Sequence, residues 1–407
     1  MFAKKNVKNI YALTPMQEAM LFQALYDSSS SAHFEQSFYH ISGKLDVQIF
    51  EAAWNEIVRR HDILRTIFVH KDVPRPLQIV LKKRSINFNF EDISSLPKKE
   101  QDKYFEKQKE EDWLKPFVLS KDILMRVSLF KTGDRSFNVL WSFHHILIDG
   151  WSNSIIYNEF YQIYKDLSKG IKPGLKPTVP FALYIRWLKE QDNNAAELYW
   201  REYLSGYNQP IGLPRKIAEE QTAYHAKTFC FELDEKVTAA LQKTASKNHV
   251  GFNTVIQTMW GILLGQYNDP NDSVFGAVVS GRPAEIQGIE NMVGLLINLI
   301  PVRIQFDPLQ SFKEIMLKVH DNSIKSKPFH HCSLASIQAE TTLKQNLLDH
   351  VLVFENYPME ESATKTSNEK NEKNEKQDDT FIIDQFEHAD HTNYDLNIQI
   401  APGDKLH

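Results

Sequence analysis

The run Phe143-His144-His145-Ile146-Leu147-Ile148-Asp149-Gly150-Trp151 joins two segments whose hydrophobic patterns differ. The segment before it, Phe137–His144, alternates in character and predicts a strand. The segment after it, Trp151–Lys169, has the pattern of a helix. A strand that ends in two histidines and turns through Asp-Gly into a helix indicates an α/β fold with its chemistry at the strand end.

The two neighbouring histidines cannot both face the same cleft, because adjacent strand residues point to opposite sides. By this alternation His145 shares a side with Phe143 and Trp141, whereas His144 shares a side with Ser142. A neutral imidazole in a cleft suits proton transfer from an attacking amine, since an α-amine with a pKa of about 8 is largely protonated near neutral pH. Such a base contributes roughly 10²–10⁴-fold in rate.

Other interpretations of the same run remain open. A His-His pair at a strand end is often purely structural. His144, His145 and Asp149 are of the residue types that bind zinc, but the opposed directions of the two histidines disfavour chelation, and we expect no metal. An Asp before Gly at a strand-to-helix turn is usually structural, so we expect a salt bridge from Asp149.

Helices and strands alternate in both halves of the chain. Met16–Leu25 predicts a helix that Thr14 caps and that Pro15 opens. Val47–Arg60 predicts an amphipathic helix. The second half also contains two apolar segments that predict strands, Thr228–Leu233 and Val293–Ile304. We therefore expect two α/β lobes.

Composition changes sharply at two places. Prolines and glycines break both periodicities near residues 173–180, so we place an inter-domain linker there. The N-terminal lobe is then 1–172 and the C-terminal lobe is 181–407. Residues 362–379 include Asn-Glu-Lys three times in succession and have almost no apolar residues. We expect a low-complexity surface insertion there, with a mobile loop over a site as the alternative.

The overall composition excludes several classes of protein. The chain has 407 residues, a formal net charge of -5 and no basic tract interleaved with aromatics, which argues against nucleic-acid binding. Its 2 cysteines, Cys230 and Cys332, form no CxxC pair. The most apolar stretch, Met292–Val302, is too short to span a bilayer. We expect a cytoplasmic protein that does not bind membranes.

Several motifs resemble those of one enzyme family. His144-His145-xxx-Asp149-Gly150 resembles the HHxxxDG signature of condensation domains of non-ribosomal peptide synthetases, within the chloramphenicol-acetyltransferase-like superfamily. Further similar motifs follow in the family's order at Leu13–Leu21, Arg60–Phe68, Tyr184–Trp187, Ser280–Pro283, Val293–Arg303, Pro328–His331 and Val353–Pro358. The resemblance covers essentially the whole chain.

This resemblance implies an α/β (α+β) fold of two chloramphenicol-acetyltransferase-like lobes in a V, with a tunnel between them. It implies that an acceptor amine attacks a donor thioester, both carried on phosphopantetheine arms. Upstream donor and downstream acceptor peptidyl carrier proteins supply those arms, and an adjoining adenylation domain is a further partner. The domain itself binds no cofactor, and we expect a monomer that acts in peptide antibiotic biosynthesis.

The resemblance also implies roles for individual residues. His145 matches the catalytic histidine, His144 supports the local geometry, and backbone amides at Gly150 face the reacting carbonyl. Asp149 matches a structural acid, with Arg303 as its expected salt-bridge partner from the other lobe, and Arg65 matches a structural arginine. The residues expected to line the substrate and pantetheine tunnel are Ser280, Asn298 and Trp151.

Two competing functions share these motifs. An epimerisation domain also carries HHxxxDG, but Ser280–Pro283 resembles the condensation pattern, and the glutamate-bearing motif of epimerisation domains is not found. A non-catalytic recruitment module would keep the fold and bind carriers or tailoring enzymes. Family members usually continue beyond the position of His407 into a closing strand and helix, so we expect a truncated C-terminal lobe.

Overall fold

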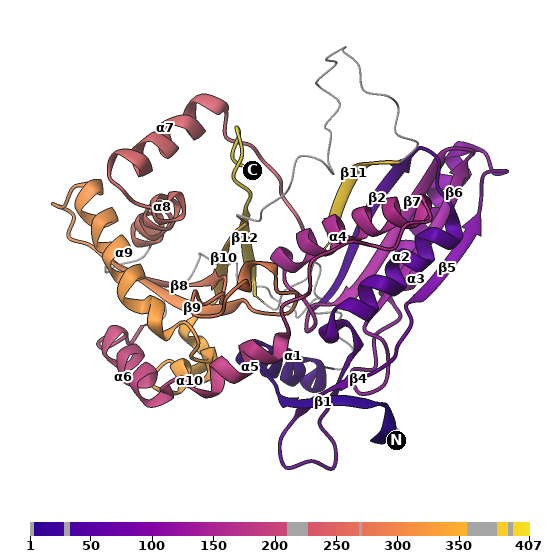
Figure 1. Ribbon diagram of the computed structural model, residues 1–407. Coiled ribbons are helices and arrows are strands. Elements are labelled where there is room, and N and C mark those ends of the chain that lie inside the picture. Colours follow the sequence, from indigo (N-terminus) through magenta and orange to yellow (C-terminus); the bar gives the residue numbers. More distant parts are fainter. Residues whose placement is uncertain (1–3, 28–32, 210–226, 268–270, 356–380, 390–393) are drawn as a thin grey trace, which may run out of the picture. The chain divides into compact units, whose positions relative to one another are not determined.

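The computed structural model describes residues 4–27, 33–209, 227–267, 271–355, 381–389 and 394–407 (Figure 1). These residues divide into two compact units. Unit 1 contains the described residues up to Lys189, together with Arg282–Leu296 and strand β11 (Ile382–Ala389). Unit 2 contains the remaining described residues. The expected insertion at 362–379 lies outside the described residues.

The boundary between the units differs from the predicted one. Helix α5 (Phe181–Lys189) and Arg282–Leu296 belong to unit 1 instead of a continuous C-terminal lobe. The reason is local packing: a Cβ atom added to Gly294 would lie 2.4 Å from the Phe181 ring, so only glycine permits this approach. The Tyr184 hydroxyl donates to the Leu296 carbonyl, at 3.3 Å. These contacts hold the two segments against each other. The Ser152 hydroxyl also lies 2.9 Å from the Gly294 carbonyl oxygen, which connects them to the rest of unit 1.

The main sheet of unit 1 has five strands in the order β11-β2-β7-β6-β5. Aromatic contacts place α2 and α4 on one face, where Trp54 and Tyr157 meet Trp141. On the other face Phe105 of α3 meets Phe130. The elements are β2 (Phe34–Ser42), α2 (Val47–Arg60), β5 (Asn87–Asp92), α3 (Lys98–Trp113), β6 (Met125–Gly133), β7 (Ser136–His144) and α4 (Gly150–Ser168).

A smaller sheet in unit 1 has three strands in the order β1-β4-β3. Next in the chain after β1 comes α1 (Pro15–Tyr26), which Thr14 and Gln17 close with a reciprocal capping box. The predicted helix at Met16–Leu25 is therefore confirmed, together with its Thr14 cap. The small-sheet strands are β1 (Val7–Ala12), β3 (Thr66–Val69) and β4 (Leu77–Leu81).

Unit 2 is built on a four-stranded sheet in the order β12-β10-β8-β9. Helices α8 and α9 pack against it around a core that includes Phe275, Leu264 and Ile315. The strands are β8 (Asp272–Val279), β9 (Asn298–Gln305), β10 (His350–Phe354) and β12 (Leu396–Ile400). The helices are α6 (Asn193–Tyr203), α7 (Glu235–Lys247), α8 (Phe252–Tyr267), α9 (Phe312–Ser326) and α10 (Leu334–Ala339).

One predicted strand is wrong, and another is confirmed only in part. Thr228–Leu233 forms no strand, and only Leu233 makes an isolated bridge, with Leu406. The predicted strand at Val293–Ile304 begins only at Asn298. Before that point the Gly294 and Leu296 amides donate to side chains at the start of α4, so they cannot join a strand ladder. Short 3-10 helices complete the described chain, at Lys4–Asn6, Asp62–Arg65, Ile289–Asn291, Lys327–Phe329 and Lys344–Leu347.

Candidate active site

The histidine run lies where β7 ends and α4 begins, as the sequence predicts. Strand β7 ends at His144, and Asp149 is the N-cap of α4. The Asp149 side chain accepts the Ser152 backbone N–H at 2.9 Å, which satisfies one of the amides that the first turn leaves without an intrahelical partner. Gly150 is the first residue of the helix. The turn from His145 to Asp149 is therefore fixed at both ends.

His144 is held as a neutral ring. Its Nδ1 accepts the Ile146 backbone N–H at 3.1 Å, so the proton of the neutral ring is on Nε2. Burial, and then the charges of His33 and His145, lower its pKa to about 3. Only 6% of the residue is exposed. His144 therefore carries no charge near neutral pH and shapes the turn through its Nδ1.

His145 holds the opposite tautomer. Its Nδ1 lies 2.6 Å from the Ile148 carbonyl oxygen. Because a carbonyl oxygen only accepts, Nδ1 carries the proton and the neutral ring has its lone pair on Nε2. The side chain is 21% exposed, and its backbone N–H donates to the His33 carbonyl at 2.8 Å. His145 is therefore the histidine of the pair that combines partial exposure with an unprotonated Nε2.

The partner of Asp149 is Arg282, which corrects the expectation of Arg303. The Arg282 guanidinium donates to both Asp149 oxygens, at 3.0 and 3.2 Å. The Asp149 side chain is fully buried and also accepts the Leu296 backbone N–H at 3.1 Å. Burial acts to raise the pKa of Asp149, but Arg282 and Ser152 outweigh it and hold the pKa below its usual value. Asp149 thus ties Arg282–Leu296 to the start of α4.

Arg303 instead pairs with Asp272 inside unit 2. Its Nε and Nη2 lie 2.9 and 2.7 Å from the Asp272 carboxylate oxygens. Asp272 stands opposite Gln305 in the β8–β9 pair, so Arg303 and Asp272 are diagonal neighbours on one face. Nη1 donates to the carbonyls of Tyr203 and Ser205. All three guanidinium nitrogens have unit 2 partners, which leaves none for Asp149.

Arg65 makes contacts of a structural kind. It is 5% exposed and donates to the carbonyls of Leu81, Val58 and Arg59. It also forms an ion pair with Asp62 at 2.5 Å. These bonds join the end of α2 to β4.

Trp151 anchors a neighbouring segment. Its indole N–H donates to the Glu290 carbonyl at 2.8 Å, and the Arg282 guanidinium lies 5.2 Å from its ring centroid. Such a cation–π contact is attractive by about 0.5–2 kcal/mol. Trp151 and Asp149 therefore hold the same segment, Arg282–Leu296.

Ser280 and Asn298 lie at one end of the unit 2 sheet. Val279 pairs with Asn298 across β8 and β9, and Ser280 follows Val279. The Asn298 amide nitrogen donates to the carbonyls of His330 and Cys332, at 2.8 and 2.7 Å. Asn298 thereby fixes the turn that follows the Pro328–His331 motif. These two residues are in unit 2 and His145 is in unit 1.

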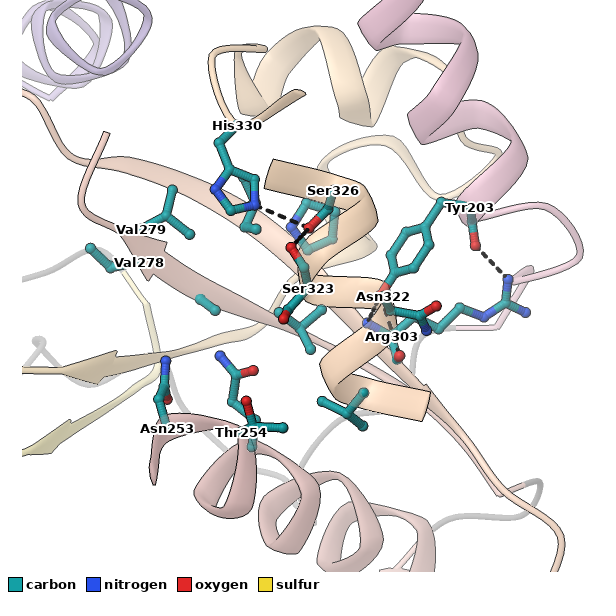
Figure 2. Close-up of a pocket in the computed structure, with 16 residues that line it drawn as sticks. Tyr203, Asn253, Thr254, Val278, Val279, Arg303, Asn322, Ser323, Ser326 and His330 are labelled. Carbon is teal, nitrogen blue, oxygen red and sulfur yellow. Dashed lines mark hydrogen bonds between the residues drawn. The ribbon is translucent and has the colours of Figure 1, made fainter. Parts of the chain in front are cut away.

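A cavity of about 140 Å³ lies beside this turn, within unit 2 (Figure 2). Figure 2 shows Asn253 and Thr254 of α8 below the strands, with Ser323, Ser326 and His330 opposite. Burial, followed by the charges of Lys327 and His331, lowers the pKa of His330 to about 4, so the ring is neutral. The cavity is lined by uncharged hydrogen-bonding groups together with Arg303, and it has room for about four water molecules.

Three functional residues were not found from the sequence. Arg282 lies in the Ser280–Pro283 motif. No sequence pattern indicates that Arg282, and not Arg303, is the partner of Asp149. The Ser152 hydroxyl lies within donating distance of both an Asp149 oxygen and the Gly294 carbonyl oxygen, at 2.8 and 2.9 Å, and it accepts the Gly294 amide. Glu35, on β2, places Oε1 3.2 Å from His145 Nδ1. No local sequence signal points to Glu35, because strand pairing alone brings it near His145.

Among the described residues, no group of three or more His, Cys, Asp and Glu side chains is arranged to hold a metal ion. Within the same part of the chain, every helix is too short or too polar to cross a bilayer.

Known sequences and structures resemble the whole chain. The family model described as "Condensation domain" matches residues 7–407. Gramicidin S synthase 2 of Brevibacillus brevis is 41% identical over 406 residues, which is 100% of this chain and 9% of the synthase. Tyrocidine synthase 2 of Brevibacillus parabrevis is 42% identical over 405 residues, 100% of this chain and 11% of that protein. The chain thus spans about a tenth of the length of these relatives.

Solved structures show the same fold. The first condensation domain of the CDA synthetase has a TM-score of 0.74 at 16% identity, covering 98% of this chain and 92% of that one. The X-domain from teicoplanin biosynthesis has a TM-score of 0.77 at 20% identity, covering 100% and 89%. The predicted mixed α/β fold of the chloramphenicol-acetyltransferase-like type is therefore confirmed, and the chain belongs to the condensation-domain family.

Proposed function

We propose that this chain forms peptide bonds between two carrier-bound substrates in a non-ribosomal peptide synthetase. The substrates are a donor acyl or peptidyl thioester and an acceptor aminoacyl thioester, each on the phosphopantetheine arm of a peptidyl carrier protein. The relatives that support this proposal are synthases named for the peptides gramicidin S and tyrocidine. The arms belong to the substrates, and an adenylation domain in the same synthetase would supply the activated amino acid.

The observation that carries the proposal is the tautomer of His145. With Nδ1–H donated to the Ile148 carbonyl, Nε2 has a free lone pair on a partly exposed ring. Nε2 can therefore accept the proton of an acceptor amine as its nitrogen attacks the donor thioester carbon. The new C–N bond forms, the C–S bond breaks, and the proton passes to the departing donor thiolate.

The rest of the proposed catalysis comes from positioning the two substrates and the groups around them. A thioester is already activated, and two tethered substrates that meet at one base react almost as a single molecule. Gly150 opens α4, and its amide has no intrahelical acceptor, so it can bind the developing oxyanion. His144 and Asp149 keep this turn in shape through their buried hydrogen bonds.

The proposal is tested by loading two carrier proteins with different amino acids and detecting the dipeptide on the acceptor by mass spectrometry. We expect His145→Ala to lower the transfer rate by roughly 10²–10⁴-fold while carrier binding persists. His40→Ala is a matched control, because it also removes an imidazole from unit 1. His40 lies on β2 and hydrogen-bonds Ser136, away from His145. Unchanged transfer by His145→Ala removes this residue from the mechanism.

The same assay separates the alternatives. An epimerisation domain would exchange the α-proton of one carrier-bound residue in deuterated water without forming a dipeptide. A recruitment module would bind carriers and do neither. A panel of L- and D-configured donors then defines which substrates are joined.

A further inference from the structure

Glu35 is buried beside the proposed base. It stands opposite Phe143 in the β2–β7 pair, and His145 follows in the turn just beyond the end of β7. Its side chain is 7% exposed, and Oε1 lies 3.2 Å from His145 Nδ1. Its other oxygen, Oε2, lies 3.5 Å from His388 Nε2 on β11. A buried carboxylate thus lies between two imidazoles.

The charge on Glu35 depends on those rings. Burial acts to raise its pKa, but His145 and His388 outweigh it and hold the pKa of this carboxyl below its usual value. The ion pairs formed by Glu35 in the described part of the chain are with these two histidines. Glu35 is therefore a negative charge whose neutralising partners are imidazoles, one of which is His145.

The other histidines nearby do not supply the positive charge. Burial, followed by the charge of His145, lowers the pKa of His33 to about 4. Burial also lowers the pKa of His144 to about 3. Both rings are neutral near pH 7, so the carboxylate acts on His145 and His388.

We propose that Glu35 is a positioning residue for the reaction, one that stabilises the imidazolium formed when His145 accepts the amine proton and fixes the ring from its Nδ1 side. This inference rests on the proposed function of His145. The Ile148 carbonyl already sets the tautomer but provides only a dipole, whereas Glu35 provides a full charge. Because the pair is largely shielded from water, salt screens this interaction only weakly.

The third member of the array orients Glu35 from its other side. His388 Nδ1 lies 3.0 Å from the Ser37 hydroxyl of β2, and His388 Nε2 faces Glu35. The Phe143 and His388 rings are also stacked, with centroids 6.5 Å apart. The array therefore runs across β7, β2 and β11, which are neighbours in one sheet (Figure 1).

The direct test measures the ring itself. Nitrogen-15 NMR of the chain at a fixed pH near 6.5 reports the ratio of protonated to neutral His145. We expect Glu35→Gln to lower this ratio about tenfold or more, the effect of removing an opposite charge within a few ångströms. Glu51→Gln, an exposed position on α2, is the charge-matched control and leaves the ratio unchanged. An unchanged ratio in Glu35→Gln overturns the inference.

Turnover gives a second readout that a merely structural residue would not move. We expect Glu35→Gln to lower kcat about tenfold, to leave KM for the loaded carriers unchanged, and to move the acid limb of the pH–rate profile to lower pH. In a His145→Ala background the same change has no further effect on kcat. Additive losses in the double variant would show that Glu35 acts independently of His145.

Two outcomes separate this inference from the proposed function. Should Glu35→Gln fail to fold, the Glu35 carboxyl carbon signal of the unaltered chain is followed through the His145 titration. We expect the signal to shift with that titration, and we expect His145→Ala to remove this part of the shift while the part due to His388 persists. A Glu35 signal that is the same in the unaltered chain and in His145→Ala overturns the inference. If the NMR coupling is present but no dipeptide forms, the proposed function fails and the electrostatic coupling stands.

Discussion

The pair Asp149–Arg282 in unit 1 and the pair Asp272–Arg303 in unit 2 have the same chemistry in different surroundings. Each is a guanidinium that donates to both oxygens of one aspartate. The side chains of the first pair are 0% and 5% exposed, whereas those of Asp272 and Arg303 are 19% and 8% exposed. An unpaired charge is more costly when it is buried. Removing one partner should therefore lower the unfolding free energy more for the Asp149–Arg282 pair than for the Asp272–Arg303 pair.

The two aspartates also differ in what else they hold. Asp149 caps α4 and accepts the Leu296 amide, so one carboxylate connects a helix start, an arginine and a distant segment. Asp272 links Arg303 and Gln305 of the adjacent strand. Arg282 therefore stabilises a junction between distant segments, because its aspartate also binds backbone amides there. Arg303, through Asp272, stabilises a local strand pair.

The largest expected effect is that of Asp149→Ala. It removes the carboxylate that neutralises the buried Arg282 side chain, and it removes the α4 cap, so we expect a loss of about 3–5 kcal/mol in unfolding free energy. Urea denaturation measures this loss. Asp272→Ala is the matched control and should cost only about 1–2 kcal/mol. A stable, soluble but inactive Asp149→Ala variant would assign Asp149 a direct catalytic role instead.

Arg282→Gln should lower the unfolding free energy by an intermediate amount. The size of this loss should depend on pH. In the unaltered chain the pKa of Asp149 is lowered, so its stabilisation is complete above about pH 3.9, its unfolded value, and is lost as the pH falls further. Without Arg282, burial, the largest of the contributions, is opposed only by hydrogen bonds, including those from Ser152. We therefore expect the pKa to rise, so that the folded state binds a proton more tightly than the unfolded state. The deficit in unfolding free energy should therefore shrink as the pH falls from 7 towards 4.

The control for this reversal is Arg303→Gln. Asp272 is 19% exposed, so water can solvate its charge when Arg303 is removed. Denaturation at pH 7 and pH 4.5 should give nearly the same deficit for this variant. An equal pH response in both arginine variants would contradict the difference between the two pairs.

The smallest expected effect is that of Trp151→Phe. It removes only the indole N–H that donates to the Glu290 carbonyl, a bond that contributes about 1 kcal/mol. Thermal denaturation should show a correspondingly small decrease in Tm, with dipeptide formation retained. A large loss of transfer at unchanged stability would instead support the prediction that Trp151 lines the substrate tunnel.

Local pattern predicted those elements whose own side chains determine them. Helix α2 has the bounds Val47–Arg60 that were expected, because Phe50, Trp54 and Ile57 are fully buried along one face. Helix α3 was not expected, because Gln101 is its one residue that is buried. An apolar face predicts a helix well, and a largely solvated helix gives little signal.

Long-range partners could not be predicted in the same way. His145 and Asp149 are neighbours in sequence, and their positions at the strand end and helix start follow from the run itself. Arg282 is 133 positions from Asp149, and another arginine in the same half of the chain fits the sequence equally well. Val293–Leu296 has the composition of a strand, yet side chains of α4 bind its amides. Tertiary hydrogen bonds therefore overrode the local preference.

The position of strand β11 late in unit 1 affects how the chain folds during its synthesis on the ribosome. Ser37 of β2 and His388 of β11 are 351 positions apart, although their strands pair side by side. Until β11 is synthesised, the β2 edge of an otherwise complete sheet presents unpaired amides and carbonyls to other nascent chains. The last segment of unit 1 to emerge thus both covers that edge and brings His388 to Glu35, so this carboxylate gains its second imidazole only after the rest of unit 1 has been synthesised.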